Sequence, residues 1–200
     1  MKHLLLIHTS LNGAKSLSSS LALEAAASWT RAHPESHIET LDFAETPIPH
    51  LTADTFGAFV TPDAERSDEQ RTRVALSDRL VEQLKAADDI ILAVPMYNFG
   101  VPSQLRAYFD HVARAGVTFR YTSDGPVGLL DDKRVTVIAT RGGQYEGTPL
   151  DNQTKYLEQF LGFLGLDNVR FVYAEGTAMG DEALDTAVQS ARASIHALHD

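Results

Sequence analysis

Apolar residues follow two different spacings along the chain. Short apolar or β-branched runs fit β-strands. These runs lie at residues 4–8, 37–41, 90–95, 135–140 and 169–174. The longer segments between them repeat apolar residues every three or four positions, which is typical of amphipathic helices. These segments lie at residues 18–31, 69–86, 104–115, 152–164 and 182–198.

The regular alternation of strand and helix predicts βαβ units. Such units build a mostly parallel sheet with helices on both faces. The chain has 200 residues, which is close to the usual size of one domain. We therefore expect a single α/β domain over residues 1–200, built on a doubly wound, five-stranded parallel sheet.

Two segments interrupt this alternation. Residues 44–67 form a long connection that contains three prolines together with Phe56 and Phe59. Long connections in compact domains are usually functional or disordered, and the aromatic residues here favour an ordered lid or an interface. Residues 116–133 contain Phe-Arg-Tyr followed by Asp-Gly-Pro, and this order predicts a short hairpin.

Ligands of an open parallel sheet bind beyond the carboxyl ends of the strands, at the point where the strand order reverses. The loops after the first, third and fourth strands are therefore the first candidates for a site. The first of these loops is rich in serine and opens onto a helix, with Ser10, Ser16, Ser18 and Ser19. Free N–H groups and the positive end of the helix dipole bind phosphate at such a position, and Lys15 adds charge. Alternatively, Ser18 caps the helix, since serine is a preferred N-cap.

The loops after the third and fourth strands suit a flat ligand. After the third strand come Met96, Tyr97, Asn98 and Phe99, between two prolines. Aromatic rings on such a stiff turn can stack on a planar ring system, and Asn98 can hydrogen-bond at its rim. Alternatively, these rings fold back onto the core. The adjacent glycines at 142–143 can present backbone N–H groups to a ligand, so the three loops together predict a site for a mononucleotide with a flat ring system.

The first loop lacks the two common nucleotide fingerprints. It contains neither G-x-G-x-x-G nor G-x-x-x-x-G-K-[ST], so neither a dinucleotide fingerprint nor a triphosphate loop is predicted there.

Composition narrows the function classes further. The formal net charge is −10, with acidic and basic residues interspersed, which disfavours nucleic acid and membrane surfaces as partners. No apolar run approaches the length of a membrane span. The chain has no cysteine, which excludes disulfides and thiolate nucleophiles and is compatible with a cytoplasmic location. The histidines lack a third ligand within sequence reach, so we expect no metal site.

Several motifs resemble one known family. They are Pro-Met-Tyr-Asn-Phe at 95–99, Ala-Arg-Ala-Gly-Val-Thr-Phe-Arg-Tyr at 113–121, Arg-Gly-Gly at 141–143, Phe-Leu-Gly-Phe at 160–163 and Ala-Glu-Gly at 174–176. In combination they make the chain similar, over essentially its whole length, to the bacterial FMN-dependent NADH:quinone oxidoreductases, or azoreductases. The resemblance implies a flavodoxin-like homodimer with the strand order 2-1-3-4-5, tightly bound FMN as cofactor and NADH as electron donor.

The resemblance also implies roles for individual residues. FMN would be held by three segments: Ser10, Ser16, Leu17 and Ser18, then Met96, Tyr97, Asn98 and Phe99, and finally Thr140, Arg141, Gly142 and Gly143. Substrates would lie against four aromatic residues: Phe99, Tyr121, Tyr145 and Phe163. Of these, Phe99, Tyr121 and Phe163 match the aromatic residues that cover the flavin at the dimer interface. Leu17 stands where relatives often have a polar residue, which matters little if only its backbone contributes. Tyr145 stands where some relatives have histidine, and this difference bears on substrate preference.

The implied activity is a ping-pong cycle that transfers two electrons from NADH to quinones and reductively cleaves aromatic azo compounds. No protein nucleophile is required, because the cofactor carries the chemistry. The main alternative is an FMN-binding electron carrier without NADH-dependent activity of its own. A hydrolase built on Ser10 would need a G-x-S-x-G elbow, which the sequence lacks around this residue. A phospho-receiver domain would need clustered acidic residues after the first strand and an aspartate after the third, and the sequence has neither.

Overall fold

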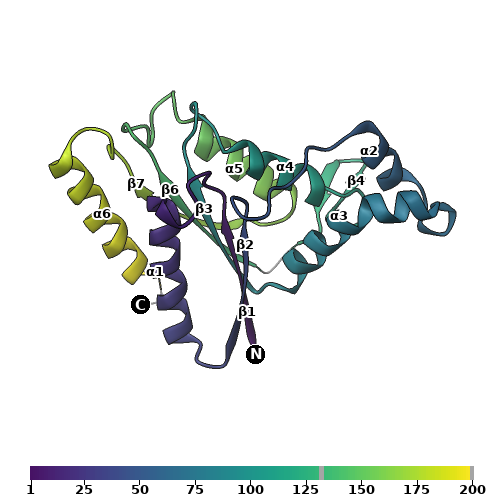
Figure 1. Ribbon diagram of the computed structural model, residues 1–200, viewed down its shortest axis with the longest axis horizontal. Coiled ribbons are helices and arrows are strands. Elements are labelled where there is room, and N and C mark those ends of the chain that lie inside the picture. Colours follow the sequence, from purple (N-terminus) through teal and green to yellow (C-terminus); the bar gives the residue numbers. More distant parts are fainter. Residues whose placement is uncertain (131–132, 199–200) are drawn as a thin grey trace.

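A five-stranded parallel sheet forms the centre of the molecule (Figure 1). The computed structural model describes residues 1–130 and 133–198. The strands of the sheet are β1 (Lys2–His8), β2 (Ser36–Asp42), β3 (Asp89–Pro95), β6 (Arg134–Thr140) and β7 (Asn168–Ala174). Their order is β2-β1-β3-β6-β7, and every neighbouring pair runs parallel. All five predicted strands are confirmed, and their order is the expected 2-1-3-4-5 when the strands of this sheet are counted along the chain.

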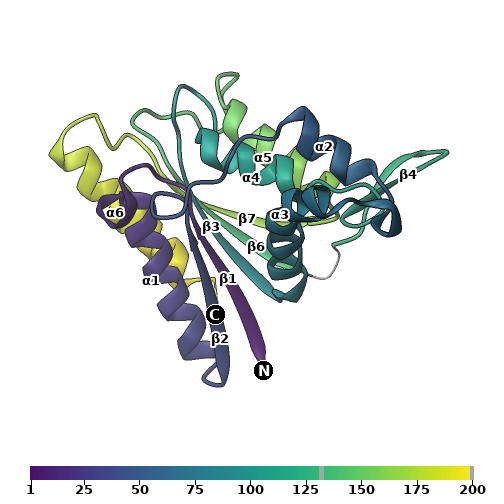
Figure 2. The same cartoon turned by 45° about the vertical axis from the view of Figure 1, so that its right-hand side comes forward.

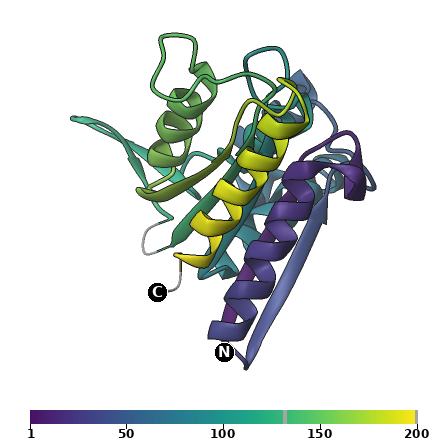
Figure 3. The same cartoon turned by 90° about the vertical axis from the view of Figure 1, so that its left-hand side faces the viewer.

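The helices pack in two layers against the sheet (Figures 2 and 3). One layer consists of α1 (Leu17–Ala32) and α6 (Asp181–His196), and the other of α3 (Asp68–Ala86), α4 (Ser103–Val112) and α5 (Asn152–Phe163). The central strand β3 is buried along its whole length. Its alternate residues join two apolar clusters: Ile90 and Leu92 pack with α3, α4 and α5, whereas Ile91 and Ala93 pack with α1 and α6. The five predicted helices are confirmed, and no helix of the described residues has the length and apolarity that crossing a bilayer requires.

The long connection between β2 and α3 is ordered and contains a helix that its sequence pattern did not predict. This helix, α2, spans Ala53–Val60. The connection is anchored on the end of α4, where the Pro49 carbonyl lies 2.9 Å from His111 Nε2. The guanidinium of Arg114 lies 4.1 Å from the centre of the Phe59 ring. These contacts hold the connection in place beside the C-terminal end of α4.

The predicted hairpin is present as β4 (Phe119–Thr122) and β5 (Gly125–Gly128), which pair antiparallel. It projects from one side of the molecule (Figure 2), and its residue Tyr121 is 75% exposed. At its base, Gly128 passes so close to Gly165 that a Cβ atom on Gly128 would lie 2.0 Å from the Gly165 nitrogen. Glycine is therefore required at position 128 by a close approach of two backbones.

Candidate active site

The loops after β1, β3 and β6 meet at the carboxyl edge of the sheet because these three strands are neighbours. Two hydrogen bonds join the loops directly. The Ser10 hydroxyl lies 3.0 Å from the Tyr97 hydroxyl, and the Met96 N–H donates to the Thr140 carbonyl at 2.8 Å. The structure therefore brings together the three segments that the sequence indicated.

The loop after β1 ends in a helix N-terminus with unpaired donors. The first helical hydrogen bond of α1 runs from the Ser20 N–H to the Ser16 carbonyl, so the N–H groups of Leu17, Ser18 and Ser19 have no acceptor within the helix. Ser16 occupies the N-cap position, but its side chain makes no capping bond and instead lies 2.8 Å from the Ser18 hydroxyl. The interpretation of Ser18 as the helix cap is wrong, because this residue lies inside the first turn. Free N–H groups, two hydroxyls and a first turn without acidic residues together suit a phosphate.

Two buried polar atoms near this loop have no partner among the described residues: Ser19 Oγ and His8 Nδ1. His8 is the last residue of β1, and burial lowers the pKa of its imidazole while Asp42 partly opposes the effect. Burial therefore favours the neutral ring. Unpaired buried polar atoms are rare in native proteins, and these two lie at the end of β1 and in the first turn of α1. His8 does not stand out in the sequence, because its only local signal is a polar residue after an apolar run.

The turn after β3 has an unusual backbone. Tyr97 and Gly100 exchange two backbone hydrogen bonds of 3.1 and 3.0 Å. Between them, Asn98 and Phe99 have φ angles of 49° and 63°, the pattern of a type I′ turn. Glycine or asparagine is favoured at such positions, and phenylalanine costs about 1–2 kcal/mol there. Phe99 is 54% exposed, so the alternative in which this ring folds back onto the core is wrong.

In the loop after β6, the Arg141 side chain points into the protein, whereas the backbone N–H groups of the two glycines remain available to a ligand. The guanidinium of Arg141 is fully buried and forms ion pairs with Asp151 at 3.1 Å and Glu175 at 2.8 Å. The side chain of Arg141 therefore makes its polar contacts inside the protein. By contrast, the N–H groups of Gly142 and Gly143 donate to no acceptor within the part of the chain that the structure describes. Of the predicted Arg-Gly-Gly segment, the two glycines remain free to contact a ligand through their backbone.

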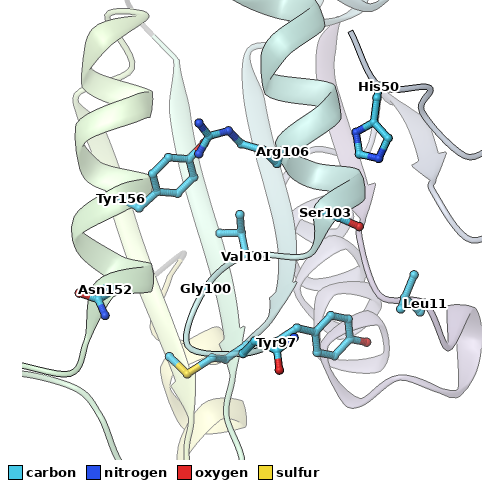
Figure 4. A pocket seen from close by; sticks show the side chains of 11 residues that line it. Leu11, His50, Tyr97, Gly100, Val101, Ser103, Arg106, Asn152 and Tyr156 are labelled. Atoms are coloured by element: carbon cyan, nitrogen blue, oxygen red, sulfur yellow. The ribbon is translucent and has the colours of Figure 1, made fainter.

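A cavity of about 880 Å³ lies beside the turn (Figure 4). Met96, Tyr97 and Asn98 form part of its wall, and its size is that of a typical small-molecule site. Arg106 on α4 reaches toward Tyr156 on α5, with the guanidinium 5.0 Å from the ring centre. Burial raises the pKa of the Tyr156 hydroxyl, and the neighbouring Arg106 partly opposes this effect. Neither residue stands out in the sequence, because each occupies an ordinary position in an amphipathic helix.

The four aromatic residues expected at the substrate site fall into two groups. Phe99 and Tyr145 lie edge to face, with ring centres 5.8 Å apart. Phe163 at the end of α5 packs on Phe119 of the hairpin at 4.3 Å, and Tyr121 lies farther along the same hairpin. None of the four rings is among the residues that line the cavity beside the turn. Within one chain, the structure therefore brings two of the four together near the turn and leaves the other two at the hairpin.

Comparison with known proteins identifies the family. Residues 2–198 match a family described as having a flavodoxin-like fold. A protein named FMN-dependent NADH:quinone oxidoreductase from Alteromonas mediterranea is 49% identical over 195 residues, covering 98% of this chain and 97% of that protein. A protein of the same name from Burkholderia pseudomallei is 47% identical over 198 residues, covering 99% of this chain and 100% of that protein. The chain belongs to this flavodoxin-like oxidoreductase family.

Solved structures agree with the family assignment. An azoreductase from Bacillus anthracis str. Sterne has a TM-score of 0.87 and 27% identity, covering 99% of this chain and 100% of that chain. An FMN-dependent NADH-azoreductase from Bacillus anthracis str. Ames Ancestor, solved in complex with FMN, has a TM-score of 0.86 and 27% identity, covering 100% of both chains. The resemblance drawn from the motifs after β3 and β6 is thus confirmed.

Proposed function

We propose that this chain is an FMN-dependent oxidoreductase that transfers two electrons from NADH to quinones and to aromatic azo compounds. One observation carries the proposal: N–H groups that have no acceptor among the described residues lie at the start of α1 and at Gly142 and Gly143, in the two loops next to the exposed turn at 96–99. Relatives named for NADH:quinone oxidoreduction cover almost the whole chain, and a structural neighbour named for azo reduction contains FMN.

The residues present at the start of α1 fit the phosphate of FMN. A phosphate is a multiple acceptor of hydrogen bonds and carries negative charge. The N–H groups of Leu17 and Ser18 can donate to it, and so can the hydroxyls of Ser10, Ser16 and Ser18. The positive end of the α1 dipole adds to the attraction, and no acidic residue in the first turn opposes it.

The flavin ring would be held between the turn at 96–99 and the loop that begins at Thr140. When bound, FMN supplies the redox chemistry by accepting two electrons from NADH and passing them to the acceptor. The N–H groups of Gly142 and Gly143 would donate to the ring edge and stabilise negative charge there. Phe99 and Tyr145 offer apolar faces to a planar substrate. We assign Arg141 to holding its loop in shape, because its side chain is buried and its backbone N–H already donates to the Ala174 carbonyl at 2.9 Å.

We further propose that each chain forms one doubly wound domain over residues 1–200 and that the active form is a homodimer. Tyr121 and Phe163 pack on Phe119 of the hairpin, whereas Phe99 packs on Tyr145, so we propose that a second copy supplies Tyr121 and Phe163 to the substrate site. Phe56 on α2 is 56% exposed and adds apolar surface for such an interface. Because NADH is an intracellular donor, we expect the enzyme in the cytoplasm.

Steady-state kinetics with NADH and a quinone test this function. If both substrates use one site in turn, double-reciprocal lines at several quinone concentrations should be parallel. Intersecting lines would refute the shared-site cycle. A protein that binds FMN but oxidises no NADH, with either a quinone or an aromatic azo compound present, would be an electron carrier instead.

A further inference from the structure

One buried side chain forms hydrogen bonds to the turn after β3. Gln153 is the second residue of α5 and is 0% exposed. Its Nε2 group donates to the Pro95 carbonyl at 3.1 Å and to the Gly100 carbonyl at 3.2 Å. These two carbonyls bracket the positive-φ pair Asn98 and Phe99. A single amide group therefore ties together both ends of the strained turn.

The oxygen of the same amide contacts the loop after β6. Gln153 Oε1 accepts a hydrogen bond from Arg141 Nε at 3.1 Å. With two carbonyls on its nitrogen side and a guanidinium on its oxygen side, only one orientation of the amide satisfies all three bonds. An apolar side chain at this position can form none of them, and an ionised carboxylate can form only the bond to Arg141.

The Arg141 guanidinium carries the connection onward to the rest of its loop. It bonds to Asp151 at 3.1 Å and to Glu175 at 2.8 Å. The Glu175 carboxylate also accepts the backbone N–H groups of Tyr145 and Glu146, each at 3.0 Å. An unbroken series of bonds thus runs from the turn after β3, through two buried side chains, to the loop that contains the paired glycines.

We propose that Gln153 is a positioning residue that sets the spacing between the turn at 97–100 and the loop at 141–146. This inference rests on the proposed function, because these two segments are the walls between which the flavin ring would be held. A strained turn persists only while its surroundings over-determine it, and Gln153 supplies two of those constraints, with a third bond that ties it to Arg141. A preformed site binds its ligand more tightly than one that must be ordered on binding. Loss of Gln153 should therefore weaken FMN binding although this buried side chain is not itself available to FMN.

The test compares the variant Gln153→Leu with a control variant, Ser77→Ala, which also loses buried hydrogen bonds. Leucine resembles glutamine in size but can neither donate nor accept a hydrogen bond. Ser77 is also fully buried, and its hydroxyl donates to the His111 carbonyl at 2.6 Å and accepts from Arg114 at 2.7 Å. Because Ser77 belongs to α3, its loss removes buried hydrogen bonds that do not involve the turn or the loop after β6.

Three measurements on each variant separate positioning from general stability: the FMN dissociation constant by fluorescence quenching, the visible circular dichroism of bound flavin, and the urea midpoint of the FMN-free protein. We expect Gln153→Leu to raise the dissociation constant about tenfold and to alter the dichroism. We expect Ser77→Ala to lower the urea midpoint while the dissociation constant stays within about twofold of the wild type.

Wild-type FMN affinity and unchanged dichroism in Gln153→Leu would overturn the inference, regardless of the urea midpoint. If Gln153→Leu does not fold, Gln153→Asn is judged by the same criteria, since it keeps the amide but shortens its reach. A wild-type protein that binds no FMN would refute the proposed function itself, so the two failures are distinguishable.

Discussion

Replacing Gly128 with alanine should destabilise the protein and displace the hairpin that carries Tyr121. The added Cβ would lie 2.0 Å from the Gly165 nitrogen, 2.1 Å from the Leu164 carbonyl carbon and 2.4 Å from the Gly165 Cα. Real Cβ atoms essentially never approach other heavy atoms closer than 3.0 Å. One of the two backbones must therefore move by about an ångström or more.

The magnitude follows from the kind of atoms involved. All three are backbone atoms, so no side-chain rotation relieves the overlap. Overpacking costs about 1–3 kcal/mol, and we expect the upper end, about 3 kcal/mol. In a domain of this size that corresponds to a fall in melting temperature of about 6–12 °C. The bond from the Leu130 N–H to the Leu164 carbonyl, 2.9 Å long, spans the same crossing and would be strained as well.

Urea unfolding of the wild type, Gly128→Ala and Gly57→Ala tests this reasoning. Gly57 lies inside α2 with open space around its missing Cβ, so alanine there should stabilise the protein by about 0.5–1 kcal/mol. In Gly128→Ala, quinone reduction should also fall while FMN binding persists, because we propose that Tyr121 covers the site of the partner. A loss of less than about 0.5 kcal/mol in Gly128→Ala would contradict the close backbone approach. Unchanged quinone reduction would contradict the role of the hairpin.

Other changes probe the phosphate site, the strained turn and the buried ion pair. Changing Ser16 and Ser18 together to alanine should weaken FMN binding about tenfold or more and leave riboflavin affinity unchanged, because only the phosphate would use these hydroxyls; calorimetry that finds equal losses for both ligands would contradict this. Phe99→Asn should not lower the free energy of unfolding, since asparagine tolerates positive φ, but it should reduce kcat/KM for quinones in steady-state assays. Burial opposes ionisation of Asp151, yet hydrogen bonds from Thr154 and the nearby guanidinium outweigh it and hold the pKa of this carboxyl below its ordinary value. Its contribution to stability is therefore complete above the ordinary pKa, about 4, and is lost as the pH falls through the lowered value. Asp151→Asn should be less stable at neutral pH and should show a flatter acid limb when the urea midpoint is plotted against pH; a curve parallel to the wild type would count against this assignment.

The spacing of apolar residues along the chain was sufficient to predict the sheet and the helices that cover it, but not α2. The apolar run at β3 is buried on both faces, and each helix in contact with the sheet carries an apolar stripe, so local pattern and final structure agree. α2 has only eight residues, includes Gly57, and depends on contacts with the end of α4, such as the Phe59 ring against His111. Short helices are stable only through tertiary packing, which no local pattern encodes.

The candidate site was predictable where backbone and loop position decide the chemistry. A serine-rich loop before a helix and a stiff aromatic turn after a strand point to the same edge of any parallel sheet. Arg141 and Gln153 show the limit of such reasoning. Position in a loop or in the first turn of a helix does not tell whether a polar side chain faces a ligand or the interior. Their partners come from distant segments, Arg141 with Glu175 and Gln153 with Pro95, and only the folded chain places them together.

The convergence of the three loops on one FMN can be tested directly by spectroscopy. The purified protein, incubated with excess FMN and then desalted, should retain a flavin absorbance band and melt at a higher temperature than the FMN-free protein. Anaerobic addition of NADH should bleach that band. A protein that emerges colourless and melts at the same temperature with and without FMN would contradict the account.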